Sequence, residues 1–138
     1  MLRAEAGLLE GSLPIGGGPP VRERRQTRLD IEIERRPQGF IVRLDGDAGI
    51  LEAEDLDFRL MLLVGRRPDL VVFDLSNLGY VSSVTLGLLV SFRRALLKHG
   101  GRVRLAGVQP LVREILHRAG LTERFEVASS VDAALVAY

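Results

Sequence analysis

The chain lacks cysteine, long apolar runs and any marked excess of one charge. Without cysteine it can form no disulfide framework, no thiolate zinc site and no cysteine nucleophile, and this composition fits a reducing compartment. The apolar runs are far shorter than the roughly 20 residues that span a bilayer, and Glu5 and Glu10 stand where a secretory signal would be apolar. We therefore expect a cytoplasmic protein without direct membrane insertion.

The charges are nearly balanced and interspersed, with 19 Lys and Arg against 18 Asp and Glu. No basic stripe offers itself to phosphates, so nucleic acid is not an expected partner. The two histidines, His99 and His117, have no carboxylates at metal-ligand spacing, and we expect neither a metal nor a cofactor. The sequence contains no recognisable Gly-rich phosphate loop, nucleophile elbow or Ser/His/Asp arrangement, and this disfavours an enzyme.

The length of 138 residues fits one domain preceded by a short tail. Gly and Pro dominate residues 16–20, and arginines cluster at 22–25, a composition that does not bury apolar surface. We expect residues 1–27 to be a flexible N-terminal tail and residues 28–138 to form the domain.

Hydrophobic periodicity predicts a domain of strands and helices. Alternating residues over 29–34 and 40–44 predict an antiparallel hairpin, and the apolar run over 70–73 predicts a strand buried on both faces. The other expected elements are helices over 52–65, from 82 or 83 to about 100, over 110–119 and over 131–137, and strands near 103–105 and 125–127. This order predicts an α/β fold with a mixed sheet of four or five strands.

The most informative segment is 73–89, in which a buried strand is followed by a polar loop and a helix start. Its Asp74-Leu75-Ser76, aromatic Tyr80, Ser83 and Leu86-Gly87 resemble the pattern of the STAS family, which includes bacterial anti-sigma-factor antagonists and stressosome proteins. Leu44-Asp45-Gly46-Asp47 and the 101–107 segment are similar to further family motifs. The resemblance covers about residues 28–138 and implies the STAS fold, with helices mainly on one face of the sheet.

The resemblance also implies a function. Regulated members of the family bind an anti-sigma factor that is also a kinase, and this kinase phosphorylates a serine or threonine that corresponds here to Ser83, or less well to Ser82. A helix start is suited to phosphate because its unpaired N–H groups and dipole favour negative charge. The family's acidic positions hold Gly49 and Ser82 in this chain, and Val84 and Thr85 also depart from its pattern. Two interpretations of the serines therefore remain, a helix cap alone or a phosphorylation site.

The expected partner surface follows from the same segment. We expect partner contacts from a set of residues around the helix start, namely Tyr80, Ser82, Ser83, Thr85, Leu86 and Val90. Asp74, Asn77 and Gly79 are expected to shape the loop. Leu86, Val90 and Leu97 form a stripe on the helix that either neighbouring helices bury or a partner covers.

An alternative function keeps the fold but removes the switch. The chain would then be a non-phosphorylated STAS subunit, either of a stressosome-like assembly or of a lipid-transport ATPase complex. The missing acids favour this alternative. The sequence leaves a homodimer open and does not identify the partner.

Overall fold

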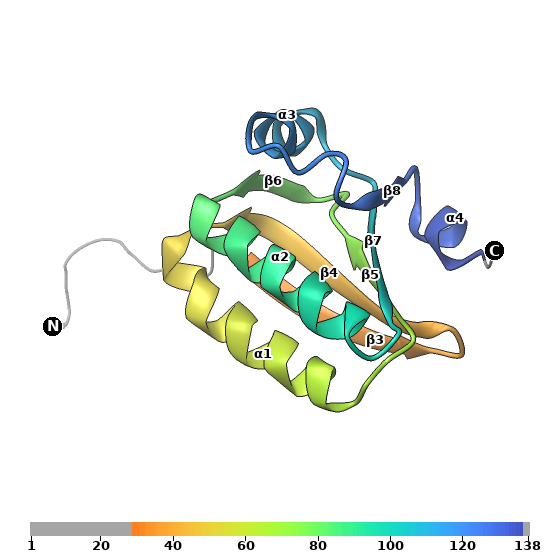
Figure 1. Cartoon of the computed structure of the whole chain (residues 1–138). Coiled ribbons are helices and arrows are strands. Elements are labelled where there is room, and N and C mark those ends of the chain that lie inside the picture. Colours follow the sequence, from red (N-terminus) through yellow and green to blue (C-terminus); the bar gives the residue numbers. More distant parts are fainter. Residues whose placement is uncertain (1–28, 137–138) are drawn as a thin grey trace, which may run out of the picture.

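The structure is a computed structural model that describes residues 29–136, so the tail expected over residues 1–27 lies outside the described residues. Figure 1 shows a sheet with two long helices, α1 and α2, side by side across one face. The strands are β3 (Leu29–Arg36), β4 (Gly39–Ala48), β5 (Leu70–Asp74), β6 (Leu78–Val81), β7 (Arg102–Ala106) and β8 (Glu126–Ala128). The helices are the 3-10 helix η2 (Ile50–Glu52) and the α-helices α1 (Ala53–Gly65), α2 (Ser83–Leu97), α3 (Pro110–Arg118) and α4 (Val131–Leu135).

The sheet is mixed, as the order of elements predicts. β3 and β4 form the antiparallel hairpin, and the order across the sheet is β3-β4-β5-β7-β8, in which the later neighbours are parallel. A further strand, β6, pairs in parallel with the end of β4. Within residues 29–136 the sheet therefore has six strands, more than the four or five expected, because the segment expected to be a loop contains β6.

Two apolar clusters fill the space on the two faces of the sheet. The larger cluster joins α1, α2 and α3 to the sheet, and at its centre the rings of Phe73 and Phe92 meet edge to face, 5.6 Å apart. The smaller cluster places Ala134 and Leu135 of α4 against Ile41 and Val72 on the opposite face. The expectation that helices pack mainly on one face is confirmed, since α4 alone of the described helices covers the other.

The β3–β4 turn depends on a glycine. Gly39 has a φ of +155°, and a Cβ atom there would lie 1.9 Å from the carbonyl oxygen of Leu70. Because backbone atoms cannot yield this space cheaply, the residue has no room for a side chain. The close approach lets β5 pair with the first half of β4, whereas β6 pairs with the last part of the same strand.

Candidate functional site

The start of α2 is bonded to the end of β4 through Ser82. The Ser82 hydroxyl caps the helix by accepting the Thr85 N–H at 3.2 Å, and the Ser82 N–H donates to the Ala48 carbonyl at 2.8 Å. The Thr85 hydroxyl donates to the same carbonyl at 3.2 Å. Ser82 and Thr85 are only 5% and 1% exposed. Ser82 is therefore a structural N-cap, which confirms the capping interpretation for this one of the two serines.

Ser83 differs from its neighbour because its side chain is exposed as the first residue of α2. The first turn continues with Val84, which is 45% exposed. The N–H groups of Ser83 and Val84 precede the first intrahelical donor, the Leu86 N–H, which donates to the Ser82 carbonyl. The positive end of the helix dipole lies at the same place. A phosphate on Ser83 would meet a favourable electrostatic environment and enough space.

The strand before α2 carries a β-bulge that exposes an aromatic side chain. Gly46 pairs with Leu78 but the next residue, Asp47, pairs with Tyr80, so Gly79 is the extra residue. A Cβ at Gly79 would lie 3.1 Å from an Asp47 carboxylate oxygen, which gives this glycine the loop-shaping position expected for it. Tyr80 is left 45% exposed beside the start of α2.

Asp74 and Asn77 hold the loop between β5 and β6. One Asp74 oxygen accepts both the N–H and the hydroxyl of Ser76, at 3.1 and 2.6 Å. The other lies 3.3 Å from Nε of Arg43. The Asn77 carbonyl accepts the Gly46 N–H at 2.9 Å. These bonds fix the loop against β4 and so fix the position of Tyr80 and the serines.

Arg43 connects this loop to the edge hairpin. Its guanidinium also donates to Glu34 at 2.8 Å, and this hydrogen bond raises the pKa of Arg43. Hydrogen bonds from Arg36 and then Arg43 lower the pKa of Glu34. The arginine therefore stays charged between two carboxylates, those of Glu34 and Asp74.

The carboxylate of Glu52 lies at the backbone of Gly49, the residue that stands at one of the family's acidic positions. Its Oε1 accepts the Gly49 N–H at 3.0 Å in a capping box, and a Cβ at Gly49 would lie 3.0 Å from the same oxygen. Gly49 directly follows Ala48, to which the start of α2 is bonded. Sequence reasoning missed Glu52, although the spacing of an acid three residues after a helix start is a known capping pattern.

The expected contact surface needs correction at three residues. Ser82 and Thr85 are buried in the cap, and Leu86 is 6% exposed because its side chain joins the core cluster that includes β6 and α3. Val90 is half-buried. The exposed side chains around the start of α2 belong to Tyr80, Ser83 and three residues that sequence reasoning missed, Ile50, Leu51 and Val84. We call these five residues the Ser83 surface.

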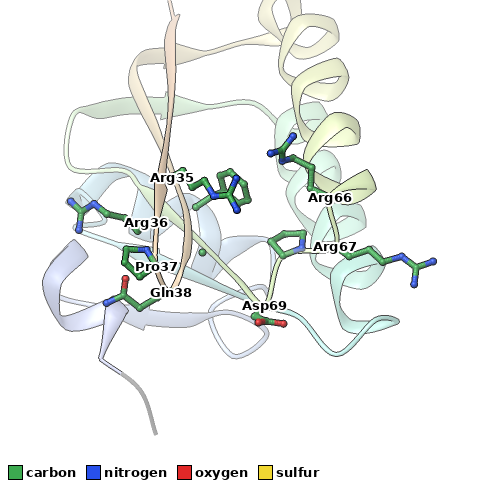
Figure 2. Close-up of a pocket in the computed structure, with 10 residues that line it drawn as sticks. Arg35, Arg36, Pro37, Gln38, Arg66, Arg67 and Asp69 are labelled. Carbon is green, nitrogen blue, oxygen red and sulfur yellow. The ribbon is translucent and has the colours of Figure 1, made fainter.

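A hollow lies at the turn end of the hairpin and has a volume of about 410 Å³. Arg35 and Arg66 lie over the Phe40 ring, 5.9 and 5.8 Å from its centre. Figure 2 shows that Arg36 and Arg67 point away from this hollow on opposite sides. The arginines therefore do not converge on a common point, as a phosphate site would require.

Within residues 29–136 there is no cluster of metal-ligating side chains, and no helix there could cross a bilayer.

The fold and this site define a small α/β domain that presents a serine and apolar side chains at a helix start. The model of the STAS domain family matches residues 30–134, and the chain belongs to this family. A comparison with curated proteins finds no match.

Solved structures share the fold. An anti-sigma factor antagonist from Mycobacterium paratuberculosis has a TM-score of 0.71 and 25% identity, over 78% of this chain and 91% of that one. The Bacillus cell fate determinant SpoIIAA, in its phosphorylated form, gives 0.64 and 18%, over 77% and 96%. A sulfate transporter family protein from Wolinella succinogenes gives 0.61 and 21%, over 69% and 80%. The similarity to the latter two supports the fold alone.

Proposed function

We propose that this STAS domain is an anti-sigma factor antagonist, which binds an anti-sigma factor with serine kinase activity and is released when Ser83 is phosphorylated. The observation that carries the proposal is the contrast between the serines, since Ser82 is buried in the cap and Ser83 is exposed. The similarity to an anti-sigma factor antagonist supports the choice of partner. In this proposal the domain acts by binding and not by catalysis.

The Ser83 surface explains how a phosphate would control binding. Ile50 and Leu51 follow the Ala48–Gly49 segment to which the start of α2 is bonded, and they are 68% and 82% exposed. A partner that covers them would exclude water from this corner. A phosphate adds about two negative charges at neutral pH, and burying them in an apolar contact costs free energy. The helix itself tolerates the phosphate, so the modification changes the interface and leaves the fold intact.

Glu52 compensates in this proposal for the acid that is missing at residue 49. Its carboxylate is held at the Gly49 N–H, on the segment to which the start of α2 is bonded. A carboxylate there could help a kinase or its metal ion engage the serine. We expect Glu52→Gln, which keeps the capping hydrogen bond, to slow phosphorylation without changing the fold.

Intact mass spectrometry after incubation with a candidate kinase and ATP tests the switch. We expect one added phosphate, lost in Ser83→Ala and retained in Ser91→Ala, the matched control because Ser91 is an exposed serine two turns further along α2. Ser83→Asp should reduce recovery of the partner in a pull-down, whereas Ser91→Asp should not. A phosphate that persists in Ser83→Ala, or equal recovery by both aspartate variants, would contradict the proposed switch.

A second candidate function is a non-phosphorylated STAS subunit of a stressosome-like assembly or of a lipid-transport ATPase complex. The sequence departures at Gly49 and Ser82 favour it, because neither residue carries a carboxylate. An unmodified chain that co-purifies with an ATPase would support this candidate over the first.

A further inference from the structure

The outward face of α1 is unusually apolar for a helix on the surface of a domain. Ala53, Leu56, Leu60 and Leu63 point into the core, as the amphipathic pattern requires. Yet Phe58, Met61 and Leu62 are 62%, 64% and 59% exposed on the other side. Adjacent large apolar side chains on a solvent-facing helix mark an interaction surface.

The charges at the two ends of this face have opposite signs. Glu54 and Asp55 lie exposed in the first turn of α1, and Arg66 and Arg67 lie exposed at its end. Along one line of the helix, residues four apart are acidic, apolar, apolar and basic, namely Glu54, Phe58, Leu62 and Arg66. When a second copy of the helix runs in the opposite direction, its basic end therefore faces the acidic end of the first copy, and apolar residues face apolar residues.

We propose that this face of α1, defined by Glu54, Phe58, Met61, Leu62 and Arg66, binds a second copy of the chain across a two-fold axis. In an antiparallel pair of α1 helices, the axis crosses the outward face at the height of residue 60 along the helix. Glu54 then faces Arg66 of the second copy and Phe58 faces Leu62 of the second copy. Each contact then occurs twice, which is the property of an isologous dimer. The opposed helix dipoles add a small favourable term.

The charge pattern selects a second copy over other occupants. An unrelated partner or the chain's own N-terminal segment would need only an apolar face, whereas this face carries acidic and basic ends at matching distances from its centre. Arg66 reaches the required position from the end of α1, where its guanidinium lies over Phe40, and Arg67 extends away from the hollow beside it (Figure 2). Both arginines are exposed, so acids that approach from outside can reach them, although Arg66 would have to turn from Phe40 toward the second copy.

The dimer leaves the Ser83 surface accessible. α1 and α2 start at the same end of the domain and run side by side in one direction (Figure 1). Antiparallel pairing of α1 therefore places the two Ser83 residues at opposite ends of the dimer.

The apolar part of the face consists of three large side chains. These bury less area than a standard interface of roughly 800 Å² per partner, so we expect a dissociation constant in the micromolar range.

Sedimentation velocity of the full chain across the micromolar range tests the proposal. We expect a monomer–dimer equilibrium that Phe58→Ser abolishes. Glu54→Arg and Arg66→Glu should each weaken it roughly tenfold, because both symmetry-related ion pairs become repulsive. The double variant should recover an affinity close to that of the wild type. Glu123→Arg, an exposed substitution far from α1, is the matched charge control and should have no effect.

Two outcomes would overturn the dimer. One is a chain that stays monomeric throughout this range. If Phe58→Ser then abolished binding of the kinase, the face of α1 would bind the kinase and not a second copy. The other is a dimer that the double variant does not restore, since its interface would lie elsewhere. Phosphorylation of Ser83, measured by mass in the same variants, reports separately on the proposed function.

Discussion

Replacement of Ser82 by alanine should destabilise the domain, whereas the same replacement of its neighbour Ser83 should not. Ser82→Ala removes the cap on the Thr85 N–H, a hydrogen bond in a site that is only 5% exposed. Loss of such a cap costs about 1–2 kcal/mol. Ser83 is exposed at the first position of α2, and substitutions at such surface positions change stability by within about 0.5 kcal/mol.

Thermal and urea unfolding followed by circular dichroism measure this difference. For a domain of this size, a loss of about 1–2 kcal/mol lowers Tm by roughly 4–10 °C. Ser82→Thr, which keeps a hydroxyl at the cap, should recover most of the lost stability and serves as the matched control. Equal destabilisation by the two alanine variants, or none by Ser82→Ala, would refute the division of the serines into a cap and a free surface residue.

Three further outcomes follow from the described contacts. Tyr80→Ala should weaken partner binding about tenfold or more in calorimetry, with unchanged Tm, because an exposed aromatic side chain is a strong interface anchor. Burial raises the pKa of Glu126, but hydrogen bonds from Arg102 and Arg104 outweigh it and hold that pKa below its usual value. The wild type should therefore be more stable than Glu126→Gln at pH values above the pKa of Glu126 in the unfolded chain. This difference should disappear as the pH falls through the lower pKa of Glu126 in the folded domain, and urea unfolding at several pH values measures it. Gly39→Ala should cost more than 2 kcal/mol, on the order of an overpacked core, or prevent folding, in the same urea assay.

Much of the fold follows from periodicity, and the missed strand has a physical cause. The alternating pattern of the hairpin and the apolar run of β5 were sufficient to place these strands. In β6 the buried residues are Leu78 and Val81, three positions apart instead of two, because the bulge at Gly79 shifts the phase. A search for period two therefore finds no strand there.

The site was predictable only where local sequence determines it. The helix start at Ser82 and Ser83 follows from capping preferences, which act within one turn. Leu86 is buried instead in a core cluster that also contains Val112 and Leu116 of α3, a helix that packs against β6. A helical projection gives the direction of a side chain but not the element that covers it, so the expected contact stripe on α2 included a core residue.

The two serines together explain how one surface could carry a switch at little cost to the fold. The cap provided by Ser82 fixes the start of α2 whether or not Ser83 is modified, because the capping bonds lie on the buried side. A phosphate on Ser83 interacts favourably with the helix dipole, by about 0.3–1 kcal/mol at an exposed site. In the proposed switch, the same charge would oppose any partner that covers Leu51 and Val84. The effects of the phosphate on folding and on binding would therefore have opposite signs, and a modification that destroyed binding by unfolding the domain would contradict this mechanism.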